Sequence, residues 1–349
     1  MTRKNKFILV IMLLIGGLIF WWEARKIPFT TLINSFQSLK VGWLVVAVLV
    51  MITSLLIESK TVQVFLKGRV AYFPYRNAVR IPMVEQLFNN ITPFSSGGQP
   101  AQLIAMMQSG VEAGQASSVL LMKFIIYQMM VLINFVLTML FGFRHIASQF
   151  KGIALLVVAG FALHVFVIIG LLLVMYRYKF TKRLVQWFAV PFSWFAKPAK
   201  VEKFKVTMDA KIDTFYAESL HLKREKKKVI IASGLTLLQL LLYYSIPVFV
   251  LLALGETHIN PLSVMAMHVM IVMITSIFPV PGGTGGAEYS FKTLFAVFLT
   301  TQGNLVVGML LWRLITYYLG MLLGLIALTI PAKKPPIAAI KINTHKKTE

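Results

Sequence analysis

Long runs of apolar residues are the feature that most limits what this chain can fold into. Six runs cover about 7–22, 41–66, 119–143, 152–175, 229–254 and 304–330. A helix that crosses a bilayer needs roughly 20 such residues, and only the first run is short. Lipid offers the backbone no hydrogen-bond partners, so these runs span as helices. We predict an all-α polytopic membrane protein with six full transmembrane helices.

The charged residues favour a membrane protein and argue against a nucleic-acid partner. Only 13% of residues are charged, whereas soluble proteins carry about 25%. The formal net charge of +23, from 35 Lys+Arg against 12 Asp+Glu, would suggest nucleic acid in a soluble protein. Here the basic residues lie between apolar runs, where they set helix orientation. The chain contains no cysteine, which excludes disulfides, thiolate metal sites and thiol nucleophiles.

The distribution of Lys and Arg predicts the orientation. Basic residues concentrate at the N-terminus, in 67–80, in 176–228 and after Pro331. Cytoplasmic loops carry this excess, so we expect both termini in the cytoplasm of a cell-membrane protein. The linkers 23–40, 144–151 and 255–262 then lie outside. No signal-peptide cleavage site follows the first run, so we expect it to be a retained helix. We divide the chain into a membrane domain, 1–331, and a basic cytoplasmic tail, 332–349.

The basic loop 176–228 contains a cluster of aromatic residues. These are Trp187, Phe188, Phe192, Trp194 and Phe195. Aromatic and basic residues together suit a helix that lies along the membrane surface, and we predict such an interfacial helix here.

Two further apolar segments, about 78–109 and 262–300, are interrupted in the middle. Prolines end a helix, and glycines supply the positive φ values of a tight reversal. The breaks consist of Pro93, Gly97 and Gly98 in the first segment and Pro279, Pro281, Gly282, Gly283, Gly285 and Gly286 in the second. We predict two re-entrant helical hairpins, the first entering from the cytoplasm and the second from outside.

An internal repeat relates the two hairpins. Leu120–Tyr127 aligns with Leu310–Tyr317, and the two glycine breaks align at almost the same offset. Repeat 1 covers about 41–143 and repeat 2 about 229–330, with one extra crossing between them that inverts the second copy. Inverted repeats with broken helices that meet at mid-membrane are typical of transporters.

Polar side chains gather at the first break. They are Asn89, Asn90, Thr92, Ser95, Ser96, Gln99 and Gln102. Irregular backbone at membrane depth persists where protein or a water-filled cavity satisfies it. The second half-helices, which should start near Gln99 and Ala287, would direct their positive ends at a phosphate in such a cavity. A packing hairpin capped by its own polar residues would explain the pattern as well.

Four ionisable residues complete the candidate substrate site. Lys123 and Arg313 lie inside apolar runs, each with a tyrosine four residues later on the same helical face, Tyr127 and Tyr317. Intramembrane charges usually mark a site, so we expect a lipid phosphate to contact them, although snorkelling to the interface is the alternative. Glu85 and Glu288 lie in the broken segments. They could balance the two cations, bind a cationic headgroup or relay protons.

The sequence contains no catalytic constellation. His164 and His268 lie alone in apolar runs, where we expect packed helix residues. No metal-ligand spacing, phosphate-binding glycine loop or nucleophile motif is present. We expect no catalytic residue, no metal and no cofactor.

The two breaks resemble the transmembrane flippase domain of the lysylphosphatidylglycerol synthase family, which includes the multiple peptide resistance factors and stand-alone relatives. The resemblance rests on Asn89–Pro93 with Gly97–Gln99, and on Pro279–Glu288, and extends from the first span to about Pro331. It implies movement of aminoacylated phosphatidylglycerol to the outer leaflet and resistance to cationic peptides. Full-length members carry a soluble transferase domain, which we do not expect in this chain. We therefore expect a transporter rather than an enzyme, even where a phosphatidylglycerol lysyltransferase name is given by similarity.

We predict a lipid flippase or scramblase for a phospholipid such as lysyl-phosphatidylglycerol, or for a glycolipid. Stand-alone relatives are linked to several lipids, so the resemblance does not fix the substrate. Two alternatives stay open: a non-transporting partner of a lipid- or glycan-modifying enzyme, docked through 176–228, and an integral membrane transferase. Glu85 and Glu288 are expected to enter from opposite faces, which argues against a catalytic dyad. The sequence also leaves open a homo-oligomer.

Overall fold

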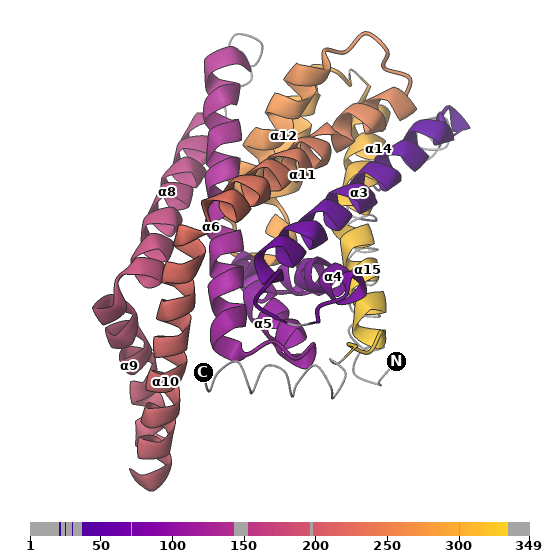
Figure 1. The fold of residues 1–349 in the computed structure, drawn as a ribbon. Helices are drawn as coiled ribbons and strands as arrows, with labels where there is room; N and C mark the ends of the chain where they lie inside the picture. The colour runs from indigo at the N-terminus through magenta and orange to yellow at the C-terminus, as the bar shows by residue number, and fades with distance from the viewer. Residues whose placement is uncertain are drawn as a thin grey trace.

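The computed structural model is helical, with no β-strand in the part of the chain that it describes (Figure 1). This part comprises residues 37–70, 72–142, 153–195, 198–299 and 301–333, with the single residues 21, 25 and 30. At 186, 188–195 and 198–206 only the backbone is described.

The helices fall into three groups along the chain. The first group is α3 (Val41–Leu66), α4 (Tyr75–Ile91), the 3-10 turn η1 (Pro93–Ser95), α5 (Gly98–Gln108), α6 (Ala113–Leu137) and the π-helical turn η2 (Thr138–Gly142). The second is α8 (Ala154–Tyr176), α9 (Tyr178–Phe195) and α10 (Pro198–Arg224). The third is α11 (Lys226–Ala253), α12 (Pro261–Thr275), the 3-10 turn η3 (Pro281–Gly283), α13 (Gly286–Phe295), α14 (Gln302–Arg313), the π-helical turn η4 (Leu314–Tyr318) and α15 (Leu319–Thr329).

Five helical runs are long and apolar enough to cross a membrane. They are Val41–Leu66, Ala113–Phe141, Ala154–Tyr176, Lys226–Ala253 and Gln302–Thr329. These runs coincide with five of the six predicted spans, which confirms a helical protein with several candidate membrane crossings. The predicted first span, 7–22, lies outside the described residues except for its edge, as do the linker 144–151 and most of the tail 332–349.

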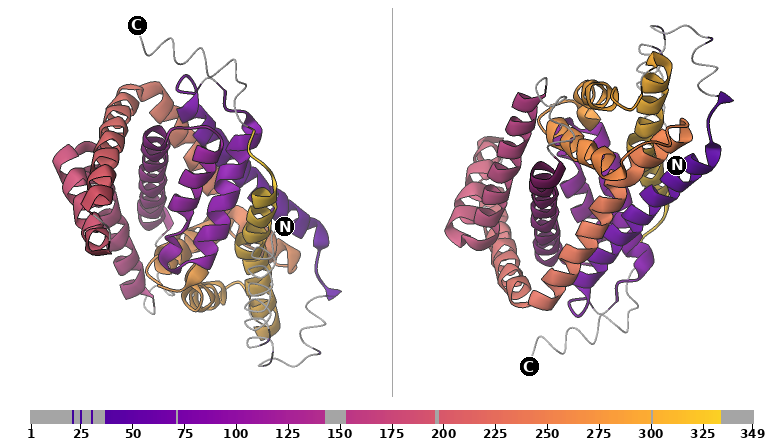
Figure 2. Two further views of the ribbon diagram at one scale, coloured as in Figure 1. Left: turned by 90° about the horizontal axis from the view of Figure 1, so that it is seen from below. Right: turned by 90° about the horizontal axis from the view of Figure 1, so that it is seen from above.

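The helices α3 and α11 pack against each other in opposite directions and cross the molecule diagonally (Figure 1). The start of α3 meets the end of α11, where Lys40 N donates to Ala253 O over 2.8 Å. At the other end, Lys228 Nζ donates to Lys67 O over 2.6 Å. The antiparallel pair lies across one side of the molecule, in front of the other helices in Figure 1, and the views of Figure 2 show it from below and from above.

Both broken segments form a helix, a 3-10 turn and a second helix, as the proline and glycine pattern predicts. The second helices begin at Gly98 and Gly286, each one residue before the predicted start. The two 3-10 turns contact each other, so the breaks meet although 188 positions separate Phe94 from Gly282. The geometry therefore brings the irregular backbone of both segments to one place.

The segment 176–228, predicted as a basic connection that contains an interfacial helix, consists mainly of the helices α9 and α10. Helix α10 packs on α6, where Ser118 Oγ lies 3.1 Å from Ser219 Oγ, and the far part of α9 and α10 extends past the other helices (Figure 1). Trp187 on α9 is exposed, which suits the predicted interfacial helix. The other aromatic side chains of that prediction lie outside the described side chains.

Helix α8 presents an apolar outer face. Leu155 and Phe166 are 81% and 74% exposed, and Val158 and Ile169 are also exposed. Its inner face contacts α12 at Gly160, where a Cβ atom would lie 2.1 Å from Met273 O. A helix with one exposed apolar face and one packed face is suited to contact lipid.

Candidate substrate cavity

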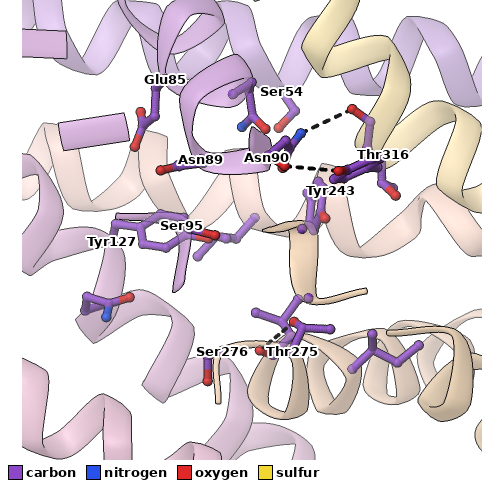
Figure 3. Close-up of a pocket in the computed structure, with 18 of the residues that line it drawn as sticks. Ser54, Glu85, Asn89, Asn90, Ser95, Tyr127, Tyr243, Thr275, Ser276 and Thr316 are labelled. Atoms are coloured by element: carbon purple, nitrogen blue, oxygen red, sulfur yellow. Dashed lines mark hydrogen bonds between the residues drawn. The ribbon is translucent and has the colours of Figure 1, made fainter. Parts of the chain in front are cut away.

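A polar cavity of about 500 Å³ lies where the two breaks meet. Residues from α3, α4, η1, α5, α6, α8, α11, α12, η3, α14 and η4 line it. Figure 3 shows Glu85, Asn89 and Asn90 of α4 across from Thr275 and Ser276 at the end of α12, with Tyr127 and Tyr243 between them. Polar side chains of this density inside apolar helices indicate a site rather than a packed core.

Most predicted site residues do line this cavity. They are Glu85, Asn89, Asn90, Ser95, Gln99, Lys123, Tyr127, Arg313 and Tyr317. Thr92, Ser96 and Glu288 do not line it. The chain therefore brings residues from both halves of the sequence into one space, and the three others stabilise its walls.

The first break is held by its own polar side chains. Thr92 Oγ1 accepts from Gly97 N over 2.8 Å, and Asn89 Oδ1 accepts from Gly98 N over 3.1 Å. These bonds satisfy backbone N–H groups at the start of α5 that have no partner within the helix. Ser96 Oγ donates to Pro93 O over 2.8 Å. These residues therefore cap their own hairpin, which is the alternative explanation that the sequence left open. The cavity lies beside this capped hairpin.

The two breaks share a rare backbone conformation. Phe94 and Ser95 both have φ of 53°, and the aligned Gly282 and Gly283 both have φ of 63°. Side chains other than glycine rarely adopt this left-handed region, and where they do, the site is often functional. Phe94 and Ser95 line the cavity, as do both glycines.

A close contact ties the second break to the last span. A Cβ atom on Gly282 would lie 1.9 Å from Tyr317 Cε2, so only glycine fits. Tyr317 Oη in turn donates to Asn90 O over 3.0 Å, and Asn90 Nδ2 donates to Tyr317 O over 3.2 Å. Tyr317 of η4 therefore contacts the second break at Gly282 and the end of α4, just before the first break, at Asn90.

Lys123 is at the centre of a buried ion triad. Its ammonium lies 2.5 Å from Glu58 Oε1 and 2.7 Å from Glu85 Oε2, and it donates to Gln102 Oε1 over 2.8 Å. An ammonium has three hydrogens, so these three acceptors use all of its donors. Gln239 Nε2 donates to the other oxygen of Glu58 over 3.1 Å. We call Glu58, Glu85 and Lys123 the Lys123 triad.

Arg313 forms a one-to-one pair with Glu288. Its Nε donates to Glu288 Oε1 over 2.7 Å, and its Nη1 donates to Gly282 O over 3.0 Å. Nη2 also lies 2.7 Å from that carboxylate oxygen, as part of the same ion pair. The ring centroid of Tyr317 lies 5.0 Å from the guanidinium carbon. Arg313 thus keeps donors available, in contrast to Lys123.

Glu288 also organises the second half-helix. Its Oε2 accepts from Gly285 N over 2.6 Å and so caps α13. The carboxylate therefore has two tasks, to cap a helix N-terminus and to hold Arg313. Both cation–carboxylate pairings proposed for Glu85 and Glu288 from the sequence occur in the structure.

His268 is a hydrogen-bonded packing residue at the cavity wall. Its Nε2 accepts from Trp312 Nε1 over 3.2 Å, and its Nδ1 lies 3.3 Å from Tyr244 O. These partners require a neutral ring with the proton on Nδ1. His164 Nδ1 lies 2.9 Å from Gly160 O. Within the described residues, no group of His, Asp and Glu is placed to hold a metal.

Sequence reasoning missed Glu58, Gln239 and Tyr243. Each is a polar residue within a predicted membrane span, and all three line the cavity. Glu58 lies in the run 41–66, where an intramembrane carboxylate is by itself a signal of a site. That signal was available without the structure, whereas the pairing with Lys123 was not.

Comparison with known proteins gives a family match over most of the chain. The family described as the lysylphosphatidylglycerol synthase TM region matches residues 9–324. A relative from Archaeoglobus fulgidus, described as a UPF0104 membrane protein, is 24% identical over 326 residues. The aligned region covers 88% of each chain.

Proposed function

The chain belongs to the lysylphosphatidylglycerol synthase TM region family, and we propose that it is a lipid flippase or scramblase of the cell membrane. One observation carries the proposal: a polar cavity of about 500 Å³ lies where two helix breaks meet among apolar helices. A lipid headgroup would occupy this cavity while its acyl chains stay in the bilayer. The substrate would be a phospholipid, such as lysyl-phosphatidylglycerol, or a glycolipid.

The architecture behind this proposal is an inverted repeat with two re-entrant hairpins. Three observations support it: the two breaks have the same succession of elements, matched pairs of left-handed residues, and direct contact with each other. The antiparallel packing of α3 on α11, the first helices of the two repeats, agrees with inversion. In such proteins, transport proceeds as one repeat moves against the other around a fixed site.

Arg313 is the residue that we assign to the phosphate. It lines the cavity, is 8% exposed, and has more N–H groups than its bonds to Glu288 and Gly282 use. Arginine binds phosphate oxygens with parallel N–H donors, and the remaining N–H groups of Arg313 can provide them. Asn90, Tyr317 and Ser95 surround the same space and offer further polar contacts.

Lys123 has a different task in this proposal. Because its three hydrogens are already bonded to acceptors, a phosphate would have to displace a carboxylate before it could bind. We therefore assign Lys123 to holding Glu58 and Glu85 in place, with direct phosphate contact only when the triad rearranges.

The proposed cellular role extends the proposed transport. We propose that both termini lie in the cytoplasm, that the protein adjusts the lipid composition of the cell envelope, and that this contributes to resistance to cationic peptides. A lipid-modifying enzyme would supply the substrate, and α9 with α10 would provide a cytoplasmic surface near it.

Leaflet-resolved lipid movement in proteoliposomes tests the proposal. The purified chain would be compared with Arg313→Ala on labelled phosphatidylglycerol, its lysyl form and a glycolipid. We expect selective movement of one lipid, at least tenfold slower in the variant because the phosphate loses its donor. If folded protein moves none of these lipids, the chain is a non-transporting partner, and the search turns to what binds α9 and α10.

A further inference from the structure

The Lys123 triad contains more negative than positive charge. Two carboxylates, Glu58 and Glu85, share one ammonium. Among the described residues, Lys123 is the one cation within 4 Å of either carboxylate. The exposed fractions of Glu58 and Lys123 are 5% and 6%, and the Glu85 side chain is 13% exposed toward the cavity, so water compensates the excess charge only in part. Burying an uncompensated charge is costly, and a ligand that removes the charge is favoured.

The second ion pair does not have this imbalance. One guanidinium, that of Arg313, pairs with one carboxylate, that of Glu288. The carboxylate also accepts a hydrogen bond from Gly285 N. The two halves of the cavity are therefore electrically different: the Arg313 half is balanced, and the Lys123 half has one excess negative charge.

The titratable and charged groups that face the cavity, besides the triad, are few. They are Tyr127 on α6, His164 on α8, Tyr243 on α11, His268 on α12, Arg313 on α14 and Tyr317 on η4. Arg313 is already paired, and His268 and His164 bond to backbone carbonyls through Nδ1. None of these groups supplies the missing positive charge to the triad.

The surroundings of Lys123 also contain an unpartnered donor. Gln102 is completely buried, its Oε1 accepts from Lys123, and its Nε2 has no hydrogen-bond partner. The bond to Lys123 fixes the orientation of the amide, because a flipped amide would direct a donor at the ammonium. The amide N–H groups beside the triad are therefore buried donors without an acceptor among the described residues.

We propose that the Lys123 triad is a proton-binding site, which accepts a proton on one of its two carboxylates and exchanges it when a headgroup enters or leaves the cavity. The proton converts a carboxylate to a carboxylic acid and makes the triad neutral. The ammonium occupies the position between the two carboxylates, which leaves no room there for a metal cation. Proton binding is independent of the proposed transport, whereas its exchange during transport rests on that function.

Infrared difference spectroscopy of the full chain in nanodiscs tests the binding. The spectrum at low pH should contain the band of a protonated carboxylic acid. The band should be absent from the spectrum at high pH. The double variant Glu58→Gln/Glu85→Gln should lose this band. The matched control Glu256→Gln, in the loop after α11, should keep it. A folded wild type without the band at any pH, or a band unchanged in the double variant, overturns the site.

Proteoliposomes with an imposed pH gradient test the exchange. The rate of lipid movement in the wild type should change at least severalfold with the gradient, and the double variant should lose this dependence. Lipid movement that ignores the gradient overturns the exchange but leaves the flippase intact. A dependence on Na⁺ instead of pH, tested by replacing Na⁺ with choline, overturns the proton as the ligand. A carboxylic acid band in a protein that moves no lipid supports the site and contradicts only the transport proposal.

Discussion

At the scale of single residues, the cavity depends on charges that are balanced by a few specific partners. Lys123 has three acceptors for three hydrogens, and Arg313 has donors to spare. The sequence identified both cations as an aligned pair, but it could not show that their environments differ. Lys123 pairs with Glu58 of α3 and Glu85 of α4, whereas Arg313 pairs with Glu288 of α13. A single sequence does not specify such distant contacts.

Removing the cation of the triad should destabilise the protein strongly. Lys123→Met leaves two buried carboxylates without a partner, and breaking a buried ion pair in this way costs about 3–5 kcal/mol. We expect the free energy of unfolding in detergent to fall by that amount. Adding Glu58→Gln and Glu85→Gln to this variant should restore most of it, since no buried charge then remains. An unchanged unfolding curve for Lys123→Met would show that the triad is not buried.

Glycine at position 282 should be essential for the second break. Gly282→Ala places a methyl group against Tyr317 at 1.9 Å and also strains a left-handed backbone. We expect loss of well-folded protein on size-exclusion chromatography. Gly255→Ala is the control, because it has φ of +91° but nothing within 4 Å, so it adds only backbone strain of about 1–2 kcal/mol. Equal behaviour of the two variants would contradict the close contact.

At the scale of elements, the two breaks were predictable and their contact was not. Pro93, Pro281 and the neighbouring glycines indicated where each apolar segment is interrupted, and the half-helix starts at Gly98 and Gly286 follow within one residue. The left-handed Phe94 and Ser95 gave no sequence signal, because neither residue type favours that region. The length of α9 and α10 in the segment 176–228 was not predicted, because basic residues predict on which side of the membrane a segment lies and say little about its helicity.

The attachment of α10 to the rest of the molecule should depend on Arg69. Its Nε donates to Glu218 over 3.2 Å and its Nη1 to Glu225 over 2.7 Å, which joins the end of α3 to α10 and the start of α11. Hydrogen bonds to charged groups contribute about 1.5–3 kcal/mol each when partly buried. We expect Arg69→Ala to make α10 susceptible to limited proteolysis.

The control for this prediction is Lys182→Ala. Lys182 pairs with Asp209 over 3.0 Å, but the two side chains are 34% and 43% exposed. Exposed pairs contribute about 0–1 kcal/mol, so this variant should be cleaved like the wild type. Resistance of Arg69→Ala to the protease would contradict the assigned attachment.

At the scale of the whole molecule, the apolar runs determined the class of protein and five of the described helical spans. What the sequence could not specify is the pairing of distant helices, such as α3 with α11, and the cavity that results. These depend on contacts between residues more than 150 positions apart, such as Ser54 with Gln239. Local pattern and periodicity contain no information about them.

The proposed orientation can be tested because the chain contains no cysteine. A single cysteine at Lys227, at the start of α11, should react with an impermeant maleimide only from the cytoplasmic side. A single cysteine at Glu256, after the same span, should react only from outside. Labelling of both positions from one side would contradict a membrane crossing by α11.

The central claim, that lipid headgroups move through the cavity, is tested most directly by blocking it. Leaflet-resolved lipid movement would be measured in proteoliposomes for wild type and for Ser276→Trp, which places a large ring at a half-buried position of the cavity wall. Leu155→Trp is the control, because Leu155 lies on the exposed outer face of α8. We predict that lipid movement stops in Ser276→Trp and continues in Leu155→Trp. Undiminished movement in a folded Ser276→Trp variant would contradict transport through this cavity.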